Sequence, residues 1–111
     1  MMSKISSIAT HYYTENDTRY AFIDGRACAH LQQCYSSLQR QLSLPDYFGR
    51  NLDALEEVLA DLDWIAEEKI KIIISEIDSL LAKEEDSRED FLEVLNTSGN
   101  KRLEIIYLGT E

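Results

Sequence analysis

The sequence predicts a small α/β domain, a three-stranded parallel sheet packed with about four helices. Three observations support this class. Apolar residues recur at spacings of three and four in two segments, as in amphipathic helices. A β-branched run at 70–74 is bounded by polar residues, as in a buried strand. Strand-like and helix-like segments alternate along the chain, which favours parallel strands joined by helical crossovers.

The 111 residues fit one compact domain, and neither an internal repeat nor a linker suggests a second. Residues 1–18 are polar with scattered aromatic side chains. We therefore expect a leader over 1–18 that is poorly ordered or weakly docked, with a short strand near 7–13 as an alternative. The domain itself is expected over 19–111.

The first half of the domain shows one strand and two helices. Residues 20–23 are β-prone and end at the turn pair Asp24-Gly25. The spacing of apolar residues predicts a helix over 27–42, followed by a loop between Pro45 and Gly49. The next helix is expected to begin at Asn51, a favoured N-cap residue, and to end around 63–66.

The second half shows two further strands. The run 69–75 predicts a strand covered on both faces, and 77–82 predicts a short helix. Asp86 or Ser87 precedes an acid by three residues, which is typical of a capping box, and Gly99 suits the end of that helix. A last strand is expected over 103–108.

The composition restricts the partners. The formal net charge is −10, from 21 acidic against 11 basic residues, so nucleic-acid phosphates and anionic membranes are repelled and a basic protein is attracted. No apolar run reaches the length of a signal peptide or a membrane span. Cys28 and Cys34 are six apart in one predicted helix, a poor spacing for a disulfide. These features favour a cytoplasmic protein with reduced thiols.

Negative charge is concentrated between Leu44 and Glu68, where Arg50 is the single basic residue among eight acids. Asp53, Glu57 and Asp61 are spaced by four and share one helical row, with Glu56 beside it. Crowded like charges cost helix stability, and a basic partner would relieve that cost. The alternative is a solvated helix face, in which Asp53 only complements the helix dipole.

Catalysis has little support in the sequence. His11 and His30 are isolated, and neither a metal-binding motif nor a phosphate-binding glycine loop is present. We therefore predict a protein that is not an enzyme and that has no cofactor and no metal site.

The segment LPDYFGRNLDAL at 44–55, together with AFIDG at 21–25, resembles the barstar family of intracellular inhibitors of a secreted bacterial ribonuclease. The resemblance covers roughly residues 19–108, and beyond the second helix it rests on pattern alone. It implies a barstar-like fold in which the loop and the following helix enter the ribonuclease active site. The partner-binding residues that it implies are Tyr47, Phe48, Gly49, Asn51, Asp53, Glu56, Glu57, Ala60 and Asp61.

Within this set, the resemblance places the main anchor of the family at Glu57, which keeps the charge and adds a methylene. Two positions depart from the pattern: Glu56 replaces a tryptophan, and an acid of the last helix aligns near Thr97. Phe48 is also a candidate for the core because it lacks a polar group, whereas Tyr47 can expose its hydroxyl.

The sequence thus predicts an inhibitor or immunity protein that blocks a basic bacterial ribonuclease, possibly a toxin. The alternatives are a non-inhibitory barstar-like adaptor of another basic protein and a small carboxylate enzyme. A second acidic cluster at 84–93 is expected to be a solvated face with a helix cap, and joining the binding surface is its alternative. The oligomeric state stays open.

Overall fold

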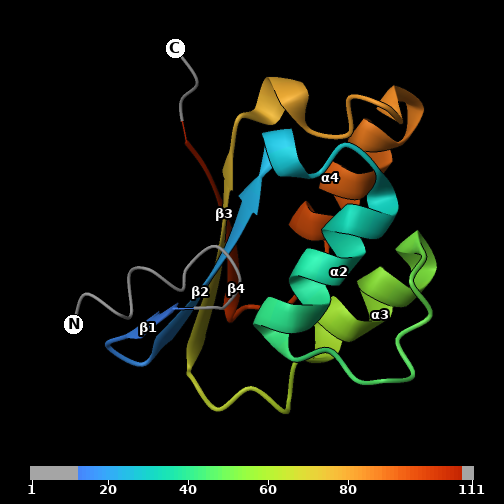
Figure 1. Ribbon diagram of the computed structural model, residues 1–111. Helices are drawn as coiled ribbons and strands as arrows, with labels where there is room; N and C mark the ends of the chain where they lie inside the picture. Colours follow the sequence, from blue (N-terminus) through green and yellow to red (C-terminus); the bar gives the residue numbers. More distant parts are fainter. Residues whose placement is uncertain (1–12, 109–111) are drawn as a thin grey trace.

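The computed structural model describes residues 13–108 and confirms the α/β class. A four-stranded sheet in the order β1-β2-β3-β4 carries three α-helices on one side (Figure 1). The strands are β1 (Tyr13–Glu15), β2 (Thr18–Asp24), β3 (Lys69–Ser75) and β4 (Leu103–Tyr107). The helices are α2 (Leu31–Leu42), α3 (Leu52–Asp61) and α4 (Arg88–Asn96), and 3-10 turns occupy Gly25–Ala27, Ile77–Ser79 and Glu85–Ser87.

The sheet is mixed, so the prediction of three parallel strands was wrong at one edge. β2, β3 and β4 are parallel, but β1 pairs antiparallel with β2, and Tyr13 faces Tyr20. Asn16 and Asp17 form the hairpin turn with φ of 54° and 60°, values that Asn and Asp tolerate better than most residues. The strand was missed because it is three polar-rich residues long and its turn contains no glycine.

Residues 13–18, which the sequence analysis assigned to the leader, therefore belong to the sheet in this structure. The alternative strand near 7–13 lies outside the described residues except for Tyr13.

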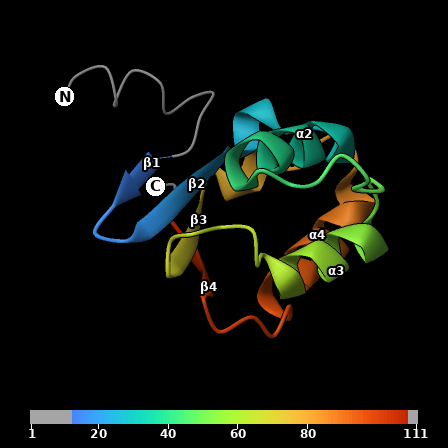
Figure 2. The same cartoon turned by 90° about the horizontal axis from the view of Figure 1, so that it is seen from below.

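The helices α2, α3 and α4 cover a single face of the sheet (Figure 2). On that face the sheet contributes fully buried aliphatic side chains, while Ile73 on the opposite face is only half-buried. The expectation that β3 is covered on both faces was therefore wrong, because all three α-helices of the described chain pack on one side. The buried residues of the sheet are Ala21, Ile23, Ile70, Ile72 and Ile74.

Two helical predictions are shortened in the structure. The first helix begins at Leu31 rather than at 27, and the short helix at 77–82 is reduced to a 3-10 turn over Ile77–Ser79. Ser87 is the N-cap of α4, but its side chain makes no capping hydrogen bond. The helix ends at Asn96 with Thr97 as its C-cap, and Gly99 follows two residues later with φ of 78°, a conformation that glycine adopts without strain. The described chain thus contains three α-helices and three 3-10 turns instead of about four helices.

Gln41 fixes α2 against the edge of β2. β1 begins at Tyr13, which lies opposite Tyr20. Two residues further along β2, the backbone N–H of Phe22 donates to Gln41 Oε1 at 2.7 Å. Gln41 Nε2 in turn donates to the Phe22 carbonyl at 2.7 Å. This side-chain amide is buried, and it satisfies both backbone polar groups of Phe22 much as a neighbouring strand would.

The two cysteines lie closer together than their sequence spacing indicated. Because α2 begins at Leu31, Cys28 lies outside the helix and its thiol forms a hydrogen bond with Cys34. This bond lowers the pKa of Cys28 and raises that of Cys34. Both thiols are buried and free. The prediction that both residues lie on one helix was wrong, since Cys28 precedes the first residue of α2.

Candidate functional site: the loop 45–50 and the acidic face of α3

The loop 45–50 presents one aromatic side chain and buries the other. The backbone N–H of Phe48 donates to the Pro45 carbonyl at 3.0 Å, which closes a tight turn. Phe48 is 5% exposed, and its ring meets that of Tyr35 edge to face at a centroid distance of 5.7 Å. Tyr47, which precedes Phe48 in the loop, is 81% exposed. Phe48 therefore anchors the loop in the core, and Tyr47 projects from it.

Asn51 begins α3 in the way the sequence predicts. It has an extended backbone with φ of −144°, and its Oδ1 accepts a hydrogen bond from the backbone N–H of Ala54 at 2.8 Å. Asp53 lies in the first turn, where the helix dipole favours a carboxylate. The cap thus defines where the helix starts and hence the direction of the side chains that follow.

Replacing Asn51 by alanine is expected to lower the free energy of unfolding by about 1 kcal/mol, because the Ala54 N–H loses its acceptor. The matched variant Asn51→Asp keeps an oxygen at that position and should leave stability within about 0.5 kcal/mol of wild type. Urea denaturation measures both. If Asn51→Ala and Asn51→Asp lower the free energy of unfolding equally, the hydrogen bond accepted from the Ala54 N–H does not contribute to stability.

The acidic row of α3 faces solvent while its apolar row is buried. Leu55, Val58 and Leu59 are in the core. Of the nine predicted partner-binding residues, Phe48 alone is buried, so it supports the surface instead of forming it. The eight exposed ones are Tyr47, Gly49, Asn51, Asp53, Glu56, Glu57, Ala60 and Asp61. One rigid helix therefore holds several carboxylates at fixed positions in water.

The carboxylates of Asp61 and Asp63 lie close enough to share a hydrogen bond. This hydrogen bond, with the negative charge of Asp61, raises the pKa of Asp63. A cation placed over the pair would counteract the repulsion between the two carboxylates. The end of α3 is thus a place where a basic side chain of a partner relieves an existing unfavourable interaction.

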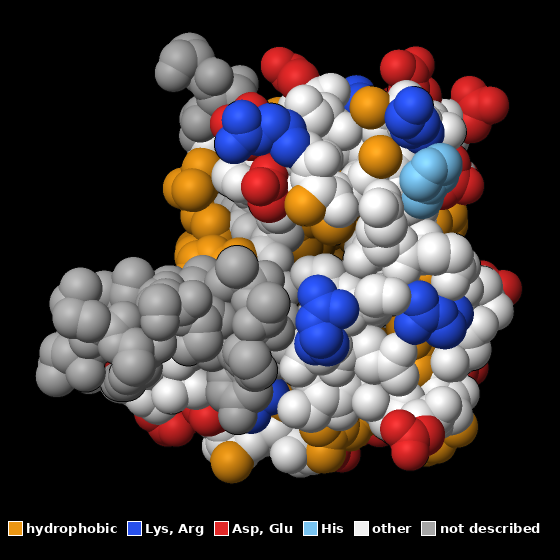
Figure 3. Space-filling model, viewed as in Figure 1, with side chains coloured by type: hydrophobic (Ala, Val, Ile, Leu, Met, Phe, Trp, Pro, Cys, Tyr) orange, Lys and Arg blue, Asp and Glu red, His pale blue; other side chains and the backbone are white. Residues whose placement is uncertain are grey.

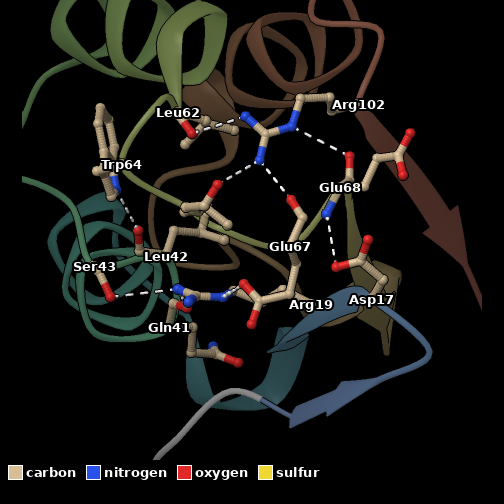
Figure 4. A network of polar contacts seen from close by, with 11 residues as sticks. Asp17, Arg19, Gln41, Leu42, Ser43, Leu62, Trp64, Glu67, Glu68 and Arg102 are labelled. Carbon is tan, nitrogen blue, oxygen red and sulfur yellow. Dashed lines mark hydrogen bonds and ion pairs between the residues drawn. The ribbon is translucent and has the colours of Figure 1, made fainter.

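The end of α3 is held by residues about forty positions further along the chain. Leu62 adopts the left-handed conformation with φ of 50°, and Asn100 Nδ2 donates to the Leu59 carbonyl at 2.9 Å. Arg102 donates to the carbonyls of Leu62 at 3.0 Å and of Ile65 at 2.6 Å, among others (Figure 4). Sequence reasoning did not find these two supporting residues, because no local pattern links positions 100 and 102 to a helix that ends at 61.

A shallow hollow of about 450 Å³ borders the start of α3. Asn51 and Asp53 line it on one side and Glu84 lines it on another. Glu84 Oε1 accepts a hydrogen bond from the backbone N–H of Leu31 at 2.5 Å and lies 3.7 Å from His30 Nδ1. Of the second acidic cluster, Glu84 thus reaches the predicted surface, but its carboxylate already supports the start of α2.

The charge distribution differs between faces of the molecule. On the face seen in Figure 3, acidic side chains lie mostly around the rim and basic ones are spread singly among neutral groups. That face is mixed in charge, in contrast to the row of carboxylates along α3. Within residues 13–108, no group of three or more His, Cys, Asp or Glu side chains is arranged to hold a metal ion. No helix of that part of the chain is long and apolar enough to span a membrane.

The chain is similar to a known protein family and to a known protein. The family model described as Barstar (barnase inhibitor) matches residues 18–105. The protein of Bacillus subtilis (strain 168) named "Putative ribonuclease inhibitor YrdF" is 44% identical over 47 residues. That alignment covers 42% of this chain and 50% of the relative, so the matched stretch spans half the length of that protein.

Proposed function

Because the chain belongs to the barstar family, we propose that it is an intracellular inhibitor, or immunity protein, that binds a basic bacterial ribonuclease. The loop 45–50 and the start of α3 cover the active site of the partner. Tyr47, Asn51, Asp53 and Glu57 make the central contacts, and Glu56, Ala60 and Asp61 surround them. The name of the Bacillus subtilis relative agrees with this assignment.

The observation that carries the proposal is the exposed carboxylate row on a helix whose other face is fixed in the core. A ribonuclease stabilises the negative charge of a phosphodiester and its transition state, so its cleft concentrates cationic and hydrogen-bond-donating groups. Carboxylates held at fixed positions can occupy the phosphate sites of such a cleft without ordering on binding. Tyr47 adds an exposed aromatic side chain beside them, a residue type that is enriched at the centres of interfaces.

The test uses a secreted basic bacterial ribonuclease, the class of partner proposed above. The two purified proteins are mixed, and RNA cleavage is measured against the concentration of the inhibitor at two salt concentrations. We expect stoichiometric loss of cleavage and an association rate that falls with salt, since exposed charges are screened beyond a Debye length of about 10 Å at 0.1 M. Full cleavage in the presence of excess inhibitor would contradict the proposal.

A second candidate is a non-inhibitory adaptor that binds a basic protein through the same face. Two residues favour it: Glu56 stands where the family pattern has a tryptophan, and Thr97 supplies no carboxylate on α4. Thr97 Oγ1 instead donates to the Glu93 carbonyl at 2.7 Å. A stable complex whose nuclease still cleaves RNA would support the adaptor over the inhibitor.

A further inference from the structure

Arg50 is the single basic residue of the acidic segment 44–68. Its guanidinium contacts α2. Arg50 Nε donates to Gln32 Oε1 at 3.0 Å, Nη1 to Gln39 Oε1 at 2.8 Å, and Nη2 to Ser36 Oγ at 2.7 Å. Nη2 also donates to the Gln32 carbonyl at 3.1 Å. One side chain therefore fastens the loop to nearly two turns of the neighbouring helix.

The backbone conformation of Arg50 also indicates that the loop is held in place. Its φ is 55°, in the left-handed region that non-glycine residues rarely adopt. Such a conformation persists where the surroundings hold it. Arg50 lies between the projecting Tyr47 and the helix cap Asn51, so its conformation sets the angle between loop and helix. The partners on α2 are neutral, and the Arg50 bonds depend on the planar, fork-like arrangement of several donors rather than on an opposite charge.

We propose that Arg50 is a positioning residue for the binding surface: it holds the loop 45–50 in its binding conformation before any partner arrives. This inference rests on the proposed function for its effect on affinity, but not for its effect on the free protein. A loop that is already ordered loses less conformational entropy on association, so the complex dissociates more slowly.

Charge and geometry predict opposite outcomes for Arg50→Gln. By charge alone, removing a cation makes the inhibitor more negative and should strengthen its encounter with a basic ribonuclease. If Arg50 positions the loop, Arg50→Gln should instead bind at least about tenfold more weakly, mainly through faster dissociation. Arg40→Gln is the matched control, because it removes an equal charge from an exposed position on α2. It should bind as wild type or slightly more tightly.

Arg50→Lys distinguishes the effect of the several donors of the guanidinium group from the effect of its charge. A lysine keeps the cation, but its single nitrogen cannot reach Gln32, Ser36 and Gln39 together. We expect it to dissociate nearly as fast as Arg50→Gln. A double-mutant cycle with Tyr47→Ala should be less than additive, since a misplaced loop already weakens the contact of Tyr47. Wild-type dissociation rates for both Arg50 variants, or for Arg50→Lys alone, would overturn the proposal.

Hydrogen exchange in the free protein tests the positioning without a ribonuclease. In Arg50→Gln the amide of Phe48, which donates to Pro45, should exchange at least about tenfold faster, while amides of β3 keep their protection. Unchanged exchange at Phe48 would overturn the positioning role. If instead the loop loosens but the wild-type protein inhibits no ribonuclease, then the proposed function fails and the role of Arg50 in the free fold stands.

Discussion

Asp53→Asn and Glu57→Gln are each expected to weaken inhibition of the ribonuclease by roughly 10²- to 4 × 10³-fold, the largest effect we predict. Each substitution keeps the shape of the side chain and removes its charge. A cationic group of the nuclease is then left buried without its partner, and breaking a buried ion pair in this way costs about 3–5 kcal/mol. Inhibition constants from RNA cleavage at fixed salt measure the effect. The double variant should lose less binding free energy than the two single variants lose together, because the two residues lie one turn apart on α3.

The same substitutions should not harm the fold. Both side chains are exposed, and removing a charge from a crowded helical row leaves the free energy of unfolding unchanged or slightly higher. If a variant is as stable as the wild type but binds more weakly, the loss comes from the binding surface and not from the fold. Glu104→Gln is the matched control, since its side chain is 61% exposed on β4, where it pairs with Lys71 at 3.8 Å. If Asp53→Asn and Glu57→Gln inhibit as strongly as Glu104→Gln does, the binding face is wrongly placed.

Arg102→Met should produce the largest loss of stability, about 3–5 kcal/mol of the free energy of unfolding. The guanidinium donates to four backbone carbonyls of the segment that joins α3 to β3, a segment with little secondary structure of its own. Charge-assisted bonds of this kind contribute about 1.5–3 kcal/mol each, but they share one donor group and do not add. The four acceptors are the carbonyls of Leu62, Ile65, Glu67 and Glu68.

Guanidinium chloride denaturation measures this loss. Arg26→Met is the control, because Arg26 is exposed and lies 3.9 Å from an exposed Asp24, an ion pair expected to contribute less than about 1 kcal/mol. Arg102→Lys should recover only part of the stability, since an ammonium group cannot serve four acceptors in this arrangement. A loss below about 1 kcal/mol for Arg102→Met would mean that water replaces the guanidinium at these carbonyls.

Local sequence patterns predicted those structural features that depend on residues close together in the chain. Asn51 caps α3 because its short side chain reaches the N–H of Ala54 within the same turn. The three- and four-residue spacing of leucines identified which side of α3 is buried, and the isoleucines of 69–75 identified the central strand β3. The motif at 44–55 indicated the family, which the family model confirms. The mixed sheet edge was missed, because a three-residue strand carries almost no periodicity.

The supports of the candidate site depended on the tertiary structure. Arg102 and Asn100 hold the end of α3 from forty residues away, Gln41 satisfies the backbone of Phe22 in β2, and Arg50 turns back onto α2. The sequence by itself determined where β2, β3, β4, α3 and α4 lie and which face of α3 is apolar, since these follow from period and local capping. Only the tertiary structure decided which polar side chain satisfies which distant backbone group, because that choice depends on distances and directions that exist after the helices have packed on the sheet.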